Sequence, residues 1–98
     1  MMKRRAMIIA VLGIFCVSTL GAITASLERA DSYFWYDRLE EAKELLLETL
    51  DRTTNDQQRV EVLWRLSRVT LSIGDERDEE GASDNELFSI YEEAEQWA

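Results

Sequence analysis

Four glutamates lie close together in the middle of the chain, where neighbouring carboxylates could act as a general acid and base or bind a cation. They are Glu40, Glu41, Glu44 and Glu48. The leucines between them recur at helical spacing, which places the glutamates on the polar face of a helix and predicts solvated side chains. The sequence contains no His, so the commonest general base is missing and no Ser or Thr has an imidazole to activate it. It also contains no Gly-rich phosphate-binding loop. We therefore expect no enzymatic activity and no cofactor.

A second group of acidic residues could be taken for a calcium site. Residues 76–85 read ERDEEGASDN, but Asp75, Asp78 and Gly81 do not have the alternating spacing of oxygen ligands in an EF-hand. Composition predicts a solvated, flexible acidic loop here and no bound metal.

Cys16 is the only cysteine, which excludes an intramolecular disulfide and a zinc-binding cysteine cluster. Phe15 before it and the apolar residues after it do not suit a bacterial lipid-attachment cysteine. We expect Cys16 to be a small apolar residue within a hydrophobic segment.

The charge of the chain is strongly asymmetric. Its 98 residues carry 20 Asp and Glu against 11 Lys and Arg, a net charge of −9. Lys3, Arg4 and Arg5 lie at the N-terminus, whereas no acidic residue occurs before Glu28. The acidic remainder would repel phosphates and anionic headgroups. We therefore expect no nucleic acid partner.

The N-terminal segment has the composition of a targeting sequence. After the basic start, residues 6–25 read AMIIAVLGIFCVSTLGAITA and carry no charge. This pattern is typical of a cleaved secretory signal peptide, and it is also long enough for an uncleaved membrane anchor; a buried core helix is the third alternative. The first two interpretations place the domain across the membrane, in a periplasmic or extracellular location. We set the boundary between residues 1–25 and a helical domain of residues 26–98.

Apolar residues at spacings of three and four predict two helices in the first half of that domain, Ser26–Tyr36 and Leu39–Arg52, joined by a turn at Asp37-Arg38. The expected buried stripe of the second comprises Leu39, Ala42, Leu46 and Leu50, joined by Leu45.

A third helix is expected over Gln57–Ile73, capped by Thr54, Asn55 or Asp56 and ended by Gly74. Its expected inward residues are Val60, Leu63, Leu66, Ser67 and Thr70. A fourth helix, Glu86–Trp97, follows a cap at Ser83 or Asp84. Its expected inward residues are Leu87, Ile90, Tyr91, Ala94 and Trp97. The fold class is therefore all-α.

The order of these residues resembles a tetratricopeptide repeat, a helix–turn–helix unit of about 34 residues that stacks on its neighbours. Leu39-Glu40-Glu41-Ala42 has the form with which the second helix of such a repeat begins. Ala30 and Tyr33 resemble the family's small and aromatic residues in the first helix, and Gly74-Asp75 its usual turn. The segment 61–68, EVLWRLSR, is similar to the regulator of microtubule dynamics family and related exported bacterial proteins. The resemblance implies about two antiparallel repeats after the N-terminal segment.

If the chain is such an array, its first helices line a concave groove. The corresponding candidate partner-binding residues are Leu27, Asp31, Phe34, Trp35, Glu61, Trp64, Arg68, Leu71 and Ser72. Aromatic and Arg side chains are frequent interface anchors. The alternative is that Trp35 and Trp64 pack between the two repeats as part of the core.

Three functions agree with these patterns. The first is a non-catalytic adaptor that binds another protein, exported or membrane-anchored. The second is an accessory protein that binds a small hydrophobic ligand for transport. The third is a fragment of a longer repeat protein. Because two repeats without polar end caps form a small core, we expect the partner to be another protein or a second copy of the chain. The membrane is contacted only through the N-terminal segment, if that segment is uncleaved.

Overall fold

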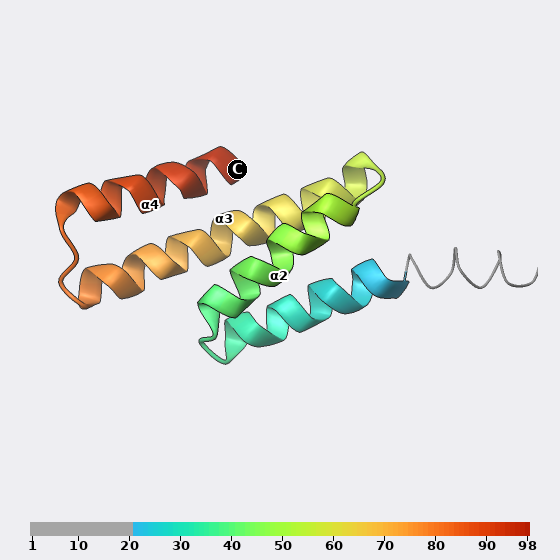
Figure 1. The fold of residues 1–98 in the computed structure, drawn as a ribbon, viewed down its shortest axis with the longest axis horizontal. Coiled ribbons are helices and arrows are strands. Elements are labelled where there is room, and N and C mark those ends of the chain that lie inside the picture. The colour runs from blue at the N-terminus through green and yellow to red at the C-terminus, as the bar shows by residue number, and fades with distance from the viewer. Residues whose placement is uncertain (1–20) are drawn as a thin grey trace, which may run out of the picture.

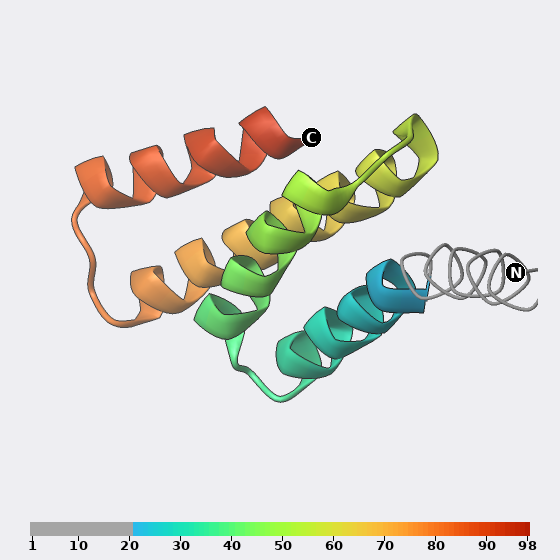
Figure 2. The same ribbon diagram turned by 45° about the vertical axis from the view of Figure 1, so that its right-hand side comes forward.

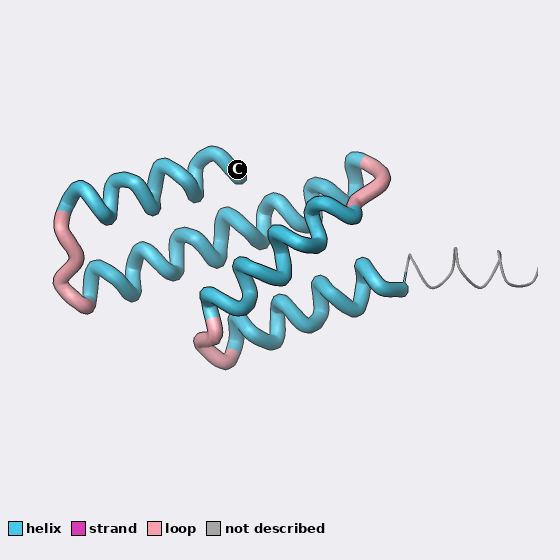
Figure 3. The backbone as a smooth tube through the Cα atoms, in the orientation of Figure 1, coloured by secondary structure: helices cyan, strands magenta, loops and turns pink. Residues whose placement is uncertain are grey.

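The computed structural model describes residues 21–98, and these form helices joined by short connections (Figures 1 and 3). A helix covers residues 21–35 and is called here the N-terminal helix. It is followed by α2 (Leu39–Arg52), α3 (Asp56–Glu79) and α4 (Asp84–Trp97). No strand occurs within this range, so the all-α class is confirmed. Residues 1–20 of the expected signal or anchor, which include Cys16, lie outside the described residues.

The N-terminal helix already includes residues 21–25, so it begins earlier than the expected Ser26. Ile23 is only 4% exposed, which makes a residue before the expected domain boundary part of the packed structure. The helix ends at residue 35, one residue before the expected Tyr36. The backbone N–H of Arg38 donates to Tyr33 O at 2.8 Å and that of Asp37 donates to Phe34 O at 3.2 Å. This is the Schellman pattern, with Asp37 in the left-handed position at φ 60°.

The α2 helix has the bounds expected from its period and its helix-forming residues. Leu39, Ala42 and Leu46 are buried as predicted, with exposed fractions of 7%, 0% and 1%. Thr49 is also buried, and its Oγ1 donates to Leu45 O at 2.7 Å, so the hydroxyl is satisfied within the helix. Small and branched side chains on one stripe thus let α2 lie closely against its neighbours.

The α3 helix is longer than expected and does not stop at Gly74. Asn55 caps its start by accepting a hydrogen bond from Gln58 N. The helix runs on to Glu79, and the glycine that ends it is Gly81, at φ 86°. The N–H groups of Gly81 and Ala82 donate to carbonyls of the last turn, both at 3.0 Å. Within the expected flexible loop at residues 76–85, residues 76–79 belong to α3 and residues 84–85 to α4, so the connection between these helices is short.

Gly74 lies inside α3 because α4 passes too close for a side chain. A Cβ at this position would lie 2.6 Å from Tyr91 Cε1 and 3.1 Å from Ile90 Cγ2. Glycine in a helix interior is unfavourable by about 1 kcal/mol relative to alanine. Here the close approach of the two helices takes precedence over that propensity.

The core lies where the N-terminal helix, α2 and α3 meet. Its buried members are Ala30, Leu39, Ala42, Leu46, Val62, Leu66, Val69 and Ile73. The inward face expected for α3 was partly wrong: Val60 is 59% exposed, whereas Val62 and Val69 are buried. The face of α3 that packs on α2 is therefore rotated from the one that the repeat resemblance implied.

The α4 helix returns antiparallel to α3 and ends partway along it (Figures 1 and 2). Ser83 caps its start by accepting a hydrogen bond from Glu86 N, as expected. Ser67 Oγ donates to Ala94 O at 3.0 Å, and Lys43 Nζ forms an ion pair with Glu93 at 2.9 Å that joins α2 to α4. Ala94 is buried, and the other residues expected to face inward are half-buried.

Candidate protein-binding surface

One carboxylate joins the N-terminal helix to α3. Asp31 Oδ1 accepts hydrogen bonds from Arg65 Nε at 2.9 Å and from Arg68 Nη2 at 3.0 Å, and Oδ2 accepts from Arg65 Nη2 at 3.2 Å. Two arginines on successive turns of α3 thus share one acidic side chain. Charge-assisted bonds of this kind are among the stronger ones in proteins, and their planar geometry fixes the register of the two helices.

Glu61 completes the charge balance of this cluster. It accepts hydrogen bonds from Arg65 Nη1 at 2.8 Å and from Trp64 Nε1 at 3.1 Å. These bonds stabilise the ionised carboxylate, and the pKa of Glu61 is lowered, first by Trp64 and then by Arg65. Two arginines therefore lie against two carboxylates, and the seam between the helices is close to neutral within an acidic protein.

The guanidinium groups of the seam stack on aromatic rings. Arg68 Cζ lies 4.0 Å from the centroid of the Phe34 ring and 4.9 Å from that of Trp64. Arg65 Cζ lies 4.4 Å from the Trp64 ring. Trp35 meets Phe34 edge to face at 5.8 Å. Arg68 Nε is buried and has no hydrogen-bond partner. The seam thus presents flat, rigid side chains around an arginine, which is the composition of interface anchors.

The two tryptophans of the candidate groove reach the surface. Trp35 is 77% exposed and Trp64 is 42% exposed. The alternative that they pack between the helical pairs is therefore wrong for Trp35, and Trp64 contributes only part of its ring to packing, on Arg65 and Arg68. Both exposed rings are accessible to a second molecule, and Trp64 is supported by two arginines.

The structure brings together five of the nine candidate groove residues, which are Asp31, Phe34, Glu61, Trp64 and Arg68. Trp35 flanks this cluster through Phe34. Leu27 instead packs against the core, Leu71 is 45% exposed farther along α3, and Ser72 lines an acidic hollow.

Sequence reasoning missed Arg65, which contacts both Asp31 and Glu61. The sequence could have predicted its bond to Glu61, because opposite charges four residues apart face each other on a helix. Its bond to Asp31 comes from another helix and has no such local pattern.

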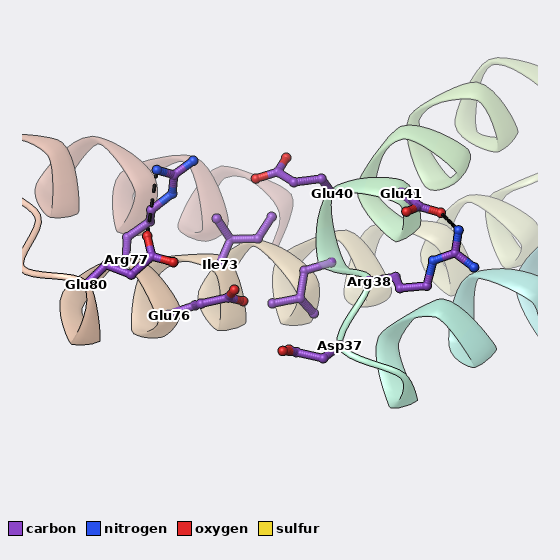
Figure 4. Close-up of a pocket in the computed structure, with 9 residues that line it drawn as sticks. Asp37, Arg38, Glu40, Glu41, Ile73, Glu76, Arg77 and Glu80 are labelled. Atoms are coloured by element: carbon purple, nitrogen blue, oxygen red, sulfur yellow. Dashed lines mark ion pairs between the residues drawn. The ribbon is translucent and has the colours of Figure 1, made fainter.

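Two adjoining open hollows lie where α2 begins and α3 ends. The first, of about 400 Å³, has Leu39 and Ile73 in its lining together with charged residues (Figure 4). The second, of about 490 Å³, includes Phe34 and Ser72. The charged residues that line one or both are Asp37, Arg38, Glu40, Glu41, Asp75, Glu76, Arg77, Glu79 and Glu80.

Negative charge is concentrated in these hollows. The pKa of Glu76 is raised, and the largest cause is the nearby charge of Asp37. Within residues 21–98, however, no group of three or more acidic side chains converges closely enough to hold a metal ion.

The other acidic residues singled out in the sequence are surface groups. Glu40, Glu44 and Glu48 are exposed, and Glu41 is paired with Arg38 on the outside of α2. Their placement agrees with the solvated polar face predicted from the helical period.

Comparison with protein-family models, with characterised proteins and with solved structures finds no match to this chain. In the part of the chain that the structure describes, no helix is both long enough and apolar enough to cross a membrane.

Proposed function

We propose that this chain is a non-catalytic adaptor of the tetratricopeptide type, which binds another protein through the seam between its N-terminal helix and α3. The observation that carries the proposal is the exposure of Trp35 and Trp64, the first beside Phe34 and the second beside Arg68, whose guanidinium lies over Phe34. Trp and Arg dominate the binding energy of protein interfaces. Tryptophan is enriched at protein interfaces because its side chain combines a large apolar ring with a hydrogen-bond donor.

Several packing details support the repeat type. The small residues expected where the helices cross, Ala30 and Ala42, are 1% and 0% exposed. The first helix of each expected pair contacts the other through Asp31 and Arg65. The helices are joined by short turns (Figure 2), as in other stacked helix pairs.

Affinity capture from the source cells, with the full-length chain and matched variants, tests this function. Trp35→Ala should lose a protein that both the wild type and Leu47→Ala retain. Leu47 is a suitable control because it is also a partly exposed apolar residue, at 36%, and lies on α2 away from the seam. A set of captured proteins that does not differ between the two variants would contradict a binding role for the seam.

We also propose that the domain lies on the non-cytosolic side of a membrane, either exported or anchored. The basic start and uncharged residues 6–25 support this proposal. An anchored chain stays with membranes through a carbonate wash. Recovery of the whole population in the soluble fraction, beginning between Gly21 and Leu27, would instead establish a cleaved signal. Recovery in the cytosol with Met1 intact would overturn both.

A further inference from the structure

Three faces of α3 are covered by other helices. Val62, Leu66 and Val69 are buried toward α2, which α3 contacts extensively. Arg65 and Arg68 face the N-terminal helix through Asp31. Ser67 and Gly74 face α4, the first through a hydrogen bond and the second through close packing.

The fourth face of α3 is apolar, and no other helix within residues 21–98 covers it. Val60, Trp64 and Leu71 are spaced by four and seven residues, so they lie on one side of the helix. They are 59%, 42% and 45% exposed. At a rise of about 1.5 Å per residue they span about three helical turns. We call these three residues the α3 strip. Such a stripe has the length and spacing that a helix of another molecule covers when it packs.

A hollow at the end of α4 continues the α3 strip sideways. It has a volume of about 290 Å³ and is lined by Val60, Leu63, Trp64, Ser67, Trp97 and Ala98. The indole Nε1 of Trp97 is buried and has no hydrogen-bond partner. Figures 1 and 2 show that α4 runs along only part of α3. The side chains of an added helix would fill this space.

Charge determines which kind of helix fits. Asp75 and Asp78 follow Leu71 by four and seven residues, so they extend the α3 strip as an acidic end. The neighbouring α4 sequence, DNELFSIYEEAEQW, has no basic residue. The cations near this acidic end are already paired: Arg65 and Arg68 with Asp31 and Glu61, and Arg77 with Glu80 at 3.9 Å. The occupant must therefore supply its own positive charge.

A second copy of the chain does not meet this requirement, because the residues from Ser26 onward carry all 20 acidic residues but only eight of the 11 basic ones, so two such domains repel each other. We infer that the α3 strip binds an amphipathic helix of a different protein, with an apolar stripe of about three turns and Lys or Arg where it meets Asp75 and Asp78. This inference rests on the proposed function and deepens it by naming the chemistry of the partner.

A synthetic helix tests the inference directly. The probe is a fluorescent peptide with Leu at positions spaced by four and seven and Lys toward the end that meets Asp75. One control peptide carries Glu in place of each Lys, and another has the same composition with the Leu period scrambled. Binding to the full-length chain, kept in nonionic detergent, is measured by fluorescence anisotropy. The Lys peptide should bind at least about tenfold more tightly than either control, and added salt should reduce the difference.

Matched variants locate the site. Val60→Glu and Leu71→Glu should each weaken binding of the Lys peptide by at least about tenfold, since each introduces a charge into the apolar stripe. Leu47→Glu places the same charge on an exposed apolar position of α2 and should change binding by less than about twofold. Circular dichroism of all three variants establishes that they fold alike.

Several outcomes would overturn the inference. They are equal binding of the three peptides, equal loss in Leu47→Glu, retention of binding in Val60→Glu and Leu71→Glu, and self-association of the chain through the same residues. If only Trp35→Ala lost binding of the Lys peptide, the peptide helix would bind at the seam, which would contradict the inference. A further result is that the peptide fails to bind at the α3 strip while Trp35→Ala still loses its cellular partner. That result would overturn the inference about the α3 strip and leave the proposed function in place.

Discussion

Asp31 and Arg65 form a two-bond ion pair between helices that are separated in sequence by α2, with Nε to Oδ1 at 2.9 Å and Nη2 to Oδ2 at 3.2 Å. The Arg65 side chain is 13% exposed and that of Asp31 is 32% exposed. Because Arg68 bonds to the same Oδ1, this one carboxylate holds the binding seam together.

Asp31→Ala should therefore lower the free energy of unfolding by about 2 kcal/mol, since it leaves the Arg68 guanidinium without a carboxylate partner and leaves Arg65 bonded only to Glu61. The control is Glu28→Ala, an exposed residue one turn earlier on the same helix, which should change stability by less than about 0.5 kcal/mol. Chemical denaturation measures both. Similar values for the two variants would show that the ion pair contributes nothing to stability.

Ala42 tests the packing of α2. It is 0% exposed, so Ala42→Leu should overpack the core and lower the free energy of unfolding by roughly 1–3 kcal/mol. Glu44→Ala changes an exposed residue half a turn away and should have an effect within about 0.5 kcal/mol. The assignment of the two faces would be wrong if both substitutions had the same effect in thermal melts.

Because Gly74 contacts Tyr91, the effect of Gly74→Ala on stability should depend on whether the Tyr91 side chain is present. Gly74→Ala should destabilise the wild type by about 1 kcal/mol, because the new methyl group displaces a ring that is also held by a hydrogen bond from Tyr91 Oη to Asp75 at 2.9 Å. In the Tyr91→Ala background the same change should stabilise by about 0.5–1 kcal/mol, through helix propensity. A double-mutant cycle from urea denaturation measures this difference, and simple additivity would contradict it.

Asp37 and Glu76 predict a pH effect. The pKa of Glu76 is raised chiefly by the charge of Asp37, so the folded state binds this proton more tightly than the unfolded state does. Its stabilising contribution is complete below the unfolded pKa of the carboxyl and is lost as the pH rises through the raised value. Asp37→Asn should therefore lose less stability than the wild type between about pH 3 and pH 7, across the ordinary glutamate range.

Asn is the suitable replacement at residue 37 because it tolerates the left-handed backbone found there, at φ 60°. Glu79→Gln serves as the control, since it removes a charge from the same end of α3 without removing the main cause of the Glu76 shift. Melting temperatures across this pH range test the prediction. Parallel curves for the wild type and Asp37→Asn would show that the two charges are not coupled.

The sequence alone predicted the elements that depend on local interactions. The bounds of α2 were correct because Leu39–Arg52 combines a clear helical period with strong helix formers. The caps at Asn55 and Ser83 were within the expected ranges because a side-chain acceptor next to free backbone N–H groups is a local requirement. The exposed glutamates of α2 followed from the same period.

Tertiary packing decided the rest. Gly74 has the local signature of a helix stop, but α3 continues through it. A side chain at this position would collide with Tyr91 of α4, so the contact between the two helices requires the glycine. Val60 is apolar like a core residue but is 59% exposed, because no helix within residues 21–98 covers that part of α3. The role of Arg65 depends on Asp31, which comes from another helix. A period along one helix identifies its apolar positions, but the neighbouring helices determine which of these are buried.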